Sequence, residues 1–409
     1  MSKLFVKTYG CTLNKKDTEN VVKEHYFTED FAEIKKSDYI LINTCGVKEQ
    51  TQTKILNFLK KLKENKIPQE KIIIFGCLVD IDKEALVKEM PDAKYFKVSE
   101  KEKIEVIINN VGNNKKNLKK NTDTIIISNG CLGNCYYCAV KFARGRLESK
   151  PIEKIIKEIE YSVNEENSKE ILLTSQDNGC YGFDINENLN TLLKRIIEIK
   201  GDFKIRVGMA NPQHLKIIID DLIKIYKNEK IYKFLHIPIQ SGSNKVLKEM
   251  NRYYTIEDVY TIIDKFKKEI PEISIGTDII VGYPTETEED FKETIKVIKK
   301  IKPNFINLSR FGMRKNIEAE KYKDLISRTK KERSREITKI FEKYILEKNK
   351  LEIGKEKEII ITEIGKNNKF VGKTNNYLSV VIDENAKIGQ KLKVKIIDAD
   401  KYYLKGKIL

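Results

Sequence analysis

Cys131, Cys135 and Cys138 stand within eight residues at the spacing C-x3-C-x2-C. Thiolates are soft ligands that suit iron–sulfur clusters and zinc. A structural zinc needs four protein ligands, yet the next cysteine is Cys180 and the chain has only 3 histidines. A 4Fe–4S cluster is normally held by four cysteines, so a set of three would leave one iron open to a small molecule. The spacing therefore favours a reactive 4Fe–4S site over a structural zinc site or a chance grouping.

The same run, with Tyr137 before its last cysteine, resembles the signature of the radical S-adenosylmethionine (SAM) enzymes. The resemblance implies that the open iron is chelated by the amino and carboxylate groups of SAM. It makes Cys131, Cys135 and Cys138 the ligands of the catalytic cluster. Two roles stay open for Tyr137, because its backbone could contact the adenine of SAM or its ring could simply pack.

The composition describes a chain of 409 residues, long enough for two or three domains, with 40% hydrophobic residues for their cores. No run of about 18 apolar residues predicts a membrane helix, and the first residues read as a strand rather than a signal peptide. We therefore expect a cytoplasmic protein with no membrane partner. In a reducing compartment its cysteines would bind metal rather than form disulfides.

The 78 basic residues exceed the 61 acidic residues and give a net charge of +17. Such an excess favours a polyanionic partner, with nucleic acid first among them. Lysine is abundant throughout and accompanied by glutamate and isoleucine, which is also typical of thermophilic proteins. Charge alone leaves both interpretations open.

Residues 1–111 alternate predicted strands and helices, which indicates a wound parallel sheet. Cys11, Cys45 and Cys77 each follow a predicted strand, at residues 4–8, 38–43 and 71–75. Because ligands bind at the carboxyl ends of parallel strands, we expect these thiols to meet in space. The alternative is that one or two of them are ordinary buried cysteines.

The stretches around these three cysteines resemble the N-terminal domain of the methylthiotransferases. They read Tyr-Gly-Cys-x-x-Asn, Asn-Thr-Cys-x-Val and Gly-Cys. The resemblance implies that Cys11, Cys45 and Cys77 hold an auxiliary 4Fe–4S cluster that handles sulfur. Asn14 is expected in the loop or as a cap of the following helix, and the resemblance adds a place near the cluster.

After a lysine- and asparagine-rich linker at 112–122, residues 123–345 form about six β/α units, which predicts a partial (β/α)6 barrel. Ser149 and Pro151 are expected to begin the first of its helices. Active sites of such barrels lie at the carboxyl ends of the strands. Polar side chains at these ends could grip the charged end and ribose of SAM: Gln176, Asp177, Arg206, Gln240 and Asp278.

Residues 128–135, 143–147, 206–212, 236–243 and 277–284 resemble the archaeal and eukaryotic branch of the tRNA methylthiotransferases. The resemblance covers the chain in order and implies a tRNA substrate carrying N6-threonylcarbamoyladenosine beside the anticodon. The chain departs from the family pattern at residues 311–319, which lack the usual Arg-Pro-Gly-Thr turn. This departure bears on the identity of the substrate.

Four residues of this domain keep more than one interpretation. Arg144 and Arg146 follow the cysteine run, so we predict RNA-phosphate or cofactor contacts over a plain solvated face. His236 lies in an apolar strand and is either a hydrogen-bonded core histidine or a functional one. Cys180 belongs to neither cysteine set and is expected to be structural.

Residues 350–409 contain five short predicted strands, which suggests a small β-barrel. This segment has 13 lysines, no arginine and 8 acidic residues, so its net charge is 13 − 8 = +5. Its pattern resembles the RNA-binding TRAM module. Tyr377, Tyr402 and Tyr403 could stack on bases, although core packing is expected for two of them. A lysine-rich helix near residues 330–348 would connect the two domains.

The sequence therefore predicts a tRNA methylthiotransferase with two 4Fe–4S clusters and SAM. Its partners would be tRNA, an electron donor such as ferredoxin or flavodoxin, and a sulfur donor. Two alternatives share the chemistry, namely another tRNA adenosine or a ribosomal protein as the substrate. A third alternative, of another class, is a zinc-dependent RNA-binding protein.

Overall fold

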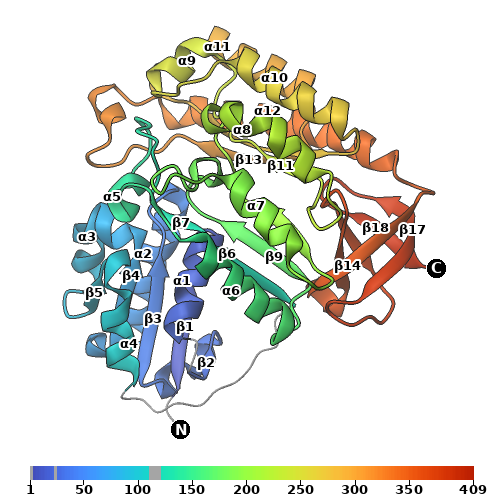
Figure 1. Cartoon of the computed structure of the whole chain (residues 1–409). Helices are drawn as coiled ribbons and strands as arrows, with labels where there is room; N and C mark the ends of the chain where they lie inside the picture. Colours follow the sequence, from blue (N-terminus) through green and yellow to red (C-terminus); the bar gives the residue numbers. More distant parts are fainter. Residues whose placement is uncertain (1–2, 23–24, 110–120) are drawn as a thin grey trace. The chain divides into compact units, whose positions relative to one another are not determined.

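The structure is a computed structural model that describes residues 3–22, 25–109 and 121–409. Most of the expected linker, residues 112–120, lies outside the described part, and Thr122 at its end begins strand β6. The chain divides into two compact units, whose segments can be followed by colour in Figure 1. The first unit is Met1–Leu118, Asn129–Leu147 and Gly312–Lys321, and the second unit is Lys119–Ser128, Glu148–Phe311 and Tyr322–Leu409.

The first unit is built on a five-stranded parallel sheet in the order β2-β1-β3-β4-β5. Its central strands are continuous apolar runs because helices bury both faces of the sheet. Helices α2 and α3 cover one face, while α1 and α4 cover the other (Figure 1). The predicted wound parallel sheet is confirmed. Its elements are β1 Leu4–Thr8, α1 Thr12–Val22, β2 Phe27–Thr28, β3 Tyr39–Thr44, α2 Glu49–Glu64, β4 Ile72–Gly76, α3 Cys77–Glu89, β5 Lys94–Phe96 and α4 Lys101–Asn109.

Two later segments of the chain complete the first unit. Asn129–Leu147 carries the C-x3-C-x2-C run and the short helix α5, Val140–Arg144. Gly312–Lys321 lies against this run, since the backbone N–H of Ala319 donates to the carbonyl of Tyr136 at 3.0 Å. All six cysteines of the two predicted sets therefore belong to one compact unit.

The second unit contains six parallel strands in two sheets, ordered β6-β9-β10 and β11-β12-β13. A bridge between Ile205 and Ile231 extends β10 toward the chain that enters β11. This arrangement confirms the predicted partial barrel. Its strands and the short β7 and β8 are β6 Thr122–Ile126, β7 Ser128–Asn129, β8 Glu148–Ser149, β9 Glu170–Thr174, β10 Lys204–Val207, β11 Phe234–His236, β12 Ser274–Val281 and β13 Phe305–Arg310.

Alternate residues of the barrel strands face the surrounding helices and form one apolar core. In β10, Ile205 and Val207 are buried in this core, whereas Arg206 between them points the other way, into the barrel. The polar positions of the strands are therefore collected inside the barrel. The helices are α6 Ile152–Asn164, α7 Leu189–Glu198, α8 Pro212–Tyr226, α9 Asn244–Glu249, α10 Ile256–Glu269, α11 Glu288–Ile301 and α12 Ser327–Lys350.

Helix α6 begins differently from the prediction. Pro151 precedes its first residue, Ile152, but no side chain caps the helix. Ser149 instead lies in β8, and its hydroxyl accepts the backbone N–H of Gly182 at 2.9 Å. The predicted serine cap was wrong, because this hydroxyl is hydrogen-bonded to a loop that is distant in the chain and not to the start of α6. Among the helices of the described residues, none is long and apolar enough to cross a membrane.

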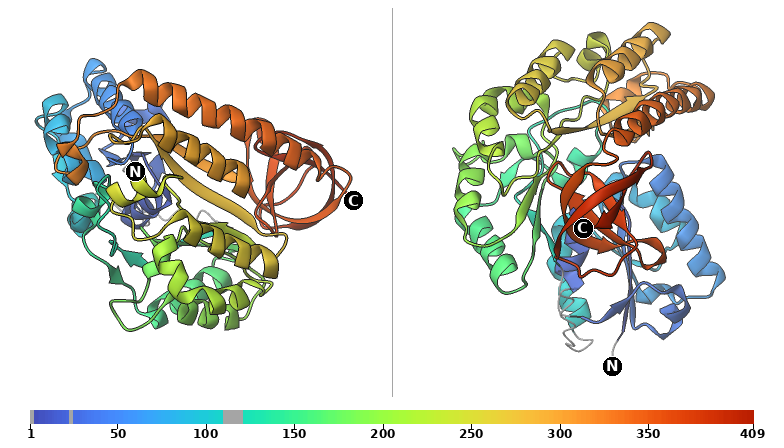
Figure 2. Two further views of the ribbon diagram at one scale, coloured as in Figure 1. Left: turned by 90° about the horizontal axis from the view of Figure 1, so that it is seen from above. Right: turned by 90° about the vertical axis from the view of Figure 1, so that its right-hand side faces the viewer.

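The chain ends in a closed five-stranded barrel, reached through α12 (Figure 2). Its strand order is β14-β15-β16-β18-β17, with the apolar side chains of alternate positions filling the interior. The predicted small β-barrel is confirmed. Its strands are β14 Glu356–Ile364, β15 Phe370–Thr374, β16 Ser379–Ile382, β17 Lys391–Ala399 and β18 Leu404–Ile408.

The turn between β15 and β16 packs against the start of the (β/α)6 barrel strands. The ring of Tyr377 lies 4.8 Å from that of Tyr232 and 5.2 Å from that of Phe234. Its neighbour Asn375 accepts the backbone N–H of Lys233 at 2.8 Å. Tyr377 therefore packs rather than faces solvent, whereas Tyr402 is 64% exposed.

We expect Tyr377→Ala to lower the free energy of unfolding by about 2 kcal/mol, because it removes a half-buried ring from an aromatic cluster. Urea denaturation measures this loss. Tyr402→Ala is the matched control, and an exposed substitution should change the same quantity by less than about 0.5 kcal/mol. Equal losses in the two variants would contradict the packing role of Tyr377.

Candidate active site

Cys11, Cys45 and Cys77 lie at the carboxyl ends of β1, β3 and β4. The first two loops touch, since a Cβ placed on Gly10 would lie 3.1 Å from the Sγ atom of Cys45. Gly10 also has a φ of +113°, a conformation that favours glycine. The pKa of Cys77 is raised to about 11, mainly by burial, while Arg144 opposes the rise and the nearby Cys45 and Cys11 contribute to it. The structure thus brings the three predicted thiols together.

Asn14 connects the three cysteine loops from inside. It is fully buried in the first turn of α1, and its side-chain amide donates to the carbonyls of Tyr9 and Thr44, each at 3.0 Å. Its Oδ1 atom lies 3.7 Å from the Sγ of Cys77 and 3.9 Å from that of Cys11. Asn14 is therefore a residue of the cysteine site and not the cap of α1.

Arg144, at the end of α5, reaches this same site. Its guanidinium is 2% exposed, with Nη2 2.6 Å from Oδ2 of Asp17 and 2.9 Å from Oδ1 of Asn14. Burial opposes the charge of this arginine, but Cys77 and Asp17 raise its pKa above the ordinary value. In the structure Arg144 contacts Asp17 and Asn14 beside the auxiliary cysteines, and its predicted RNA-phosphate or cofactor contact stays a prediction. Arg146 is exposed and keeps the predicted role as a proposal.

The cysteines of the C-x3-C-x2-C run also face a common point. The backbone N–H of Gly133 donates to the Sγ of Cys131 at 3.2 Å, and a Cβ on Gly133 would lie 3.6 Å from the Sγ of Cys135. The pKa of Cys138 is raised to about 11, mainly by burial together with Cys135 and Cys131, while backbone hydrogen bonds from Val140 and Lys141 oppose the rise. Three thiols on one short loop offer three soft ligands to a cluster.

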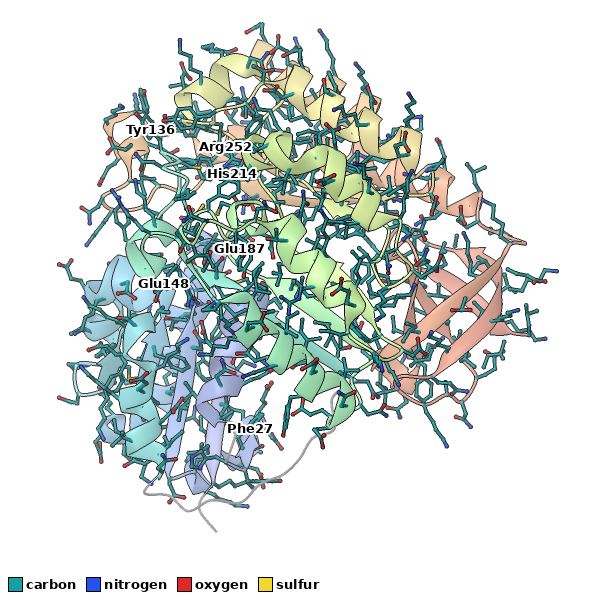
Figure 3. All side chains as sticks on the ribbon, viewed as in Figure 1. Phe27, Tyr136, Glu148, Glu187, His214 and Arg252 are labelled. Atoms are coloured by element: carbon teal, nitrogen blue, oxygen red, sulfur yellow. The ribbon has the colours of Figure 1, made fainter. Side chains whose placement is uncertain are left out.

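The segment that departs from the family pattern lies beside the auxiliary cysteines. The Nε of Arg314 donates to the carbonyl of Gly46 at 3.0 Å, one residue after Cys45, and Nη1 donates to Gln52 at 3.1 Å. Tyr136, which Figure 3 labels, accepts the N–H of Ala319 from the same segment. Beyond the missing turn, nothing in the sequence marks Arg314, because its partners are about 260 residues away in the chain.

A polar chain crosses the inside of the (β/α)6 barrel. Nε2 of His236 lies 2.7 Å from Oδ2 of Asp278, whose other oxygen accepts the amide of Asn307 at 2.6 Å. On the other side of His236, Nη2 of Arg206 lies 3.4 Å from its Nδ1. His236 is hence hydrogen-bonded through both ring nitrogens. Asn307 was missed in the sequence because nothing in β13 marks it beyond an inward position.

Asp177 is occupied by protein groups. Its Oδ1 accepts the backbone N–H groups of Gly179 at 2.9 Å and Asn211 at 3.0 Å. Its Oδ2 lies 2.8 Å from Nδ1 of His214, which stands in the first turn of α8 (Figure 3). Both side chains are 4% exposed, so Asp177 holds two loops together, and its predicted contact with SAM stays a prediction. Cys180 is fully buried nearby, and its thiol lies 3.3 Å from the carbonyl of Asp177.

We expect Asp177→Ala to lower the free energy of unfolding by about 2 kcal/mol, because it leaves two backbone N–H groups and His214 without an acceptor. Thermal or urea denaturation measures this change. Gln176→Ala is a neighbouring control that should leave stability nearly unchanged. A stable Asp177→Ala protein that no longer binds SAM would restore the direct cofactor contact.

Two other predicted SAM contacts retain unused polar atoms. Among the described residues, the buried Oε1 of Gln176 and Nε of Arg206 have no hydrogen-bond partner. Buried polar atoms without partners are costly, so they favour a polar ligand. Gln240 follows β11 with a φ of +69°, and its backbone N–H donates to the carbonyl of Asp278 at 2.8 Å. Gln176, Arg206 and Gln240 thus stay predicted contacts of SAM.

Three family models match the chain. Residues 3–97 match the uncharacterized protein family UPF0004, residues 125–298 the radical SAM superfamily, and residues 350–409 the TRAM domain. Together these matches follow the chain from the first sheet to the last barrel.

Curated relatives are similar over their whole shared length. A probable threonylcarbamoyladenosine tRNA methylthiotransferase of Archaeoglobus fulgidus is 38% identical, with 98% of each chain covered. One of Methanocaldococcus jannaschii is 36% identical over 100% of this chain and 97% of its own. The human threonylcarbamoyladenosine tRNA methylthiotransferase is 31% identical over 99% of this chain and 74% of its own.

Solved structures share the fold at low sequence identity. The radical SAM methyltransferase TsrM of Kitasatospora setae, with cobalamin and a [4Fe-4S] cluster bound, gives a TM-score of 0.59 at 12% identity. It is covered over 77% of its length, against 78% of this chain. The cobalamin-dependent SAM radical enzyme OxsB gives a TM-score of 0.51 at 13% identity, over 73% of this chain and 52% of its own.

Proposed function

The chain belongs to the threonylcarbamoyladenosine tRNA methylthiotransferases, and from this premise we propose that it methylthiolates carbon 2 of N6-threonylcarbamoyladenosine next to the tRNA anticodon. The family rests on full-length similarity at 31–38% identity together with the three matching domains. The observation that carries the proposal is the gathering of two cysteine trios in one compact unit. Another tRNA adenosine, a ribosomal protein and zinc-dependent RNA binding are not favoured as alternatives.

The cysteine sites fit two iron–sulfur clusters. Cys131, Cys135 and Cys138 would hold the catalytic 4Fe–4S cluster, and Cys11, Cys45 and Cys77 would hold the auxiliary one. With SAM bound, the catalytic cluster would supply the radical chemistry needed to remove hydrogen from an unactivated carbon that no side-chain base reaches. The auxiliary cluster supplies sulfur, and a second SAM supplies methyl.

The chain's own residues orient SAM. Gln176 and Arg206 would bind its amino and carboxylate groups through Oε1 and Nε, the buried atoms that have no hydrogen-bond partner among the described residues. Asp278 would contribute to this polar wall, because His236 and Asn307 fix both of its oxygens. Gln240 and the backbone of Tyr137 complete the proposed cofactor contacts.

Binding of tRNA is assigned to the basic surfaces. The C-terminal barrel carries 13 lysines and no arginine, which suits point-charge contacts to phosphates. Exposed Arg146 would add a contact beside the catalytic cysteines. Bases of an anticodon loop are accessible to a protein pocket, unlike those of a duplex. We also propose an electron donor such as ferredoxin or flavodoxin, and a separate sulfur donor.

We propose the following domain bounds. Residues 1–111 form the auxiliary-cluster domain, 123–345 the radical SAM domain and 350–409 the TRAM-like domain, with the linker at 112–122. The matched ranges 3–97, 125–298 and 350–409 support these bounds.

Nucleoside mass spectrometry of tRNA from a deletion strain tests the proposed function. We expect the methylthio-threonylcarbamoyladenosine signal to disappear and its unthiolated precursor to accumulate. The wild-type gene should restore the signal, and a gene encoding Cys135→Ala should not. An unchanged signal in the deletion strain would contradict the tRNA substrate.

A further inference from the structure

Arg144, which is buried, and Arg314, which is half-buried, flank the site formed by Cys11, Cys45 and Cys77, and neither comes from the sheet that carries these cysteines. Arg144 ends helix α5, and Arg314 lies in the segment Gly312–Lys321. Both segments belong to the first unit. A simple explanation is that each arginine fastens its segment to the sheet, since each has hydrogen-bond partners there.

That explanation does not account for two of the hydrogen-bond donor atoms of Arg144. Its Nη2 atom serves both Asp17 and Asn14. Its Nε and Nη1 atoms are buried and have no hydrogen-bond partner among the described residues. Asn14, which binds this guanidinium, is also 3.7 Å from the Sγ of Cys77. The guanidinium and the thiol therefore share one buried neighbour.

Arg314 has the same property on the side of Cys45. Its Nε and Nη1 atoms are used by Gly46 and Gln52. Its buried Nη2 atom has no hydrogen-bond partner in the described part of the chain. An arginine carries five N–H donors in a fixed plane, so unused ones next to thiols imply an acceptor that completes the site.

The charges of the described residues point to an anionic acceptor. Asp17 is the carboxylate that pairs with Arg144, and Lys101 already forms a second ion pair with it. The positive charge of half-buried Arg314 needs negative charge nearby, which Glu49, Asp82 and Cys45 supply in part. Three thiolates on a 4Fe–4S cluster provide such charge, and hydrogen bonds to cluster sulfurs help set the reduction potential.

We propose that Arg144 and Arg314 are positioning residues that stabilise the negative charge of the sulfur atoms at the auxiliary cluster and thereby raise its reduction potential. This inference rests on the proposed function, because it requires that Cys11, Cys45 and Cys77 hold a cluster. The loop of the catalytic cysteines and the segment lacking the family turn each contribute one of the two charges.

An EPR-monitored redox titration of the auxiliary cluster tests the proposal. The background is the full chain in which the three catalytic cysteines are alanine, reconstituted anaerobically, so that one cluster accepts one electron from dithionite. Arg144→Met and Arg314→Met should each lower the ratio of reduced to oxidised cluster at a fixed potential about tenfold, or 59 mV for one electron. Arg144→Lys retains the charge and should shift the potential less.

Arg328→Met is the matched control. This arginine is 84% exposed and pairs with Glu332 on the surface of α12, so its loss should leave the potential unchanged. If Arg144→Met does not fold because Asp17 loses a partner, the double variant Asp17→Asn/Arg144→Met removes the stranded carboxylate. Arg314→Met leaves no carboxylate without its hydrogen-bonded cation and gives an independent measurement.

The outcomes separate this inference from the proposed function. A cluster with normal iron and sulfide content but the same potential in both methionine variants would overturn the inference. Absence of any cluster in the background protein would instead contradict the assignment of Cys11, Cys45 and Cys77. A lower potential in the methionine variants but not in Arg328→Met supports the role of Arg144 and Arg314.

Discussion

Cys45→Ala is expected to abolish sulfur insertion while leaving SAM cleavage intact, whereas Cys135→Ala abolishes both activities. The two cysteines lie on different loops, one after β3 and one before α5, and belong to separate trios. Cleavage needs only the catalytic cluster and SAM, but insertion also needs sulfur at the auxiliary cluster. Release of 5′-deoxyadenosine and mass spectrometry of the tRNA nucleosides measure the two activities separately.

Iron content is the control for this pair of variants. The wild-type chain should hold about eight irons after anaerobic reconstitution, and each variant about four, because each would lose one 4Fe–4S cluster. Cys180→Ala serves as a matched substitution, since Cys180 is a buried cysteine outside both trios and should not change the iron content. A Cys45→Ala enzyme that still thiolates tRNA at normal yield would contradict the sulfur role.

Strand ends were the part of the architecture that the sequence predicted best. Strand β1 begins and ends at the predicted residues, and β3 and β4 each lie one residue beyond their predicted ranges, because their apolar runs are bounded by polar or glycine-containing turns. A parallel sheet aligns the carboxyl ends of its strands, so the meeting of Cys11, Cys45 and Cys77 follows from topology alone. The positions of functional residues that lie at strand ends could therefore be predicted from the sequence.

Side-chain contacts between residues that are far apart in the chain could not be predicted in this way. Arg144 was predicted to contact an RNA phosphate or a cofactor because it follows the cysteine run, yet Asp17 holds it in the interior. Asp177 looked like a cofactor ligand because it ends a strand, yet His214 on α8 takes its carboxylate. In both cases the contacting residue is far away in the chain, and no periodicity or spacing in the sequence indicates the contact.

The buried ion pair of Glu286 and Arg333 should give the largest loss of stability. Nη1 of Arg333 on α12 lies 2.6 Å from Oε2 of Glu286, whose side chain is 0% exposed and also accepts the N–H of Gly282. Arg333→Met strands this carboxylate in the core. Removal of one partner of a buried pair costs about 3–5 kcal/mol, which urea denaturation measures as a lower free energy of unfolding.

The pH dependence of that loss distinguishes a stranded charge from a packing defect. Burial raises the pKa of Glu286, while Gly282 and Arg333 oppose the rise. Without Arg333 the folded-state pKa rises further above the unfolded value, so the protonated carboxyl stabilises the fold at acidic pH and this contribution is lost as pH increases through the folded pKa. Arg333→Met should therefore lose more stability at pH 8 than at pH 5.

The exposed Arg328→Met is the control and should lose less than about 0.5 kcal/mol at either pH, because surface pairs contribute little. A pH-independent loss in Arg333→Met would assign the effect to packing against Phe291, whose ring centre lies 5.2 Å from the guanidinium carbon.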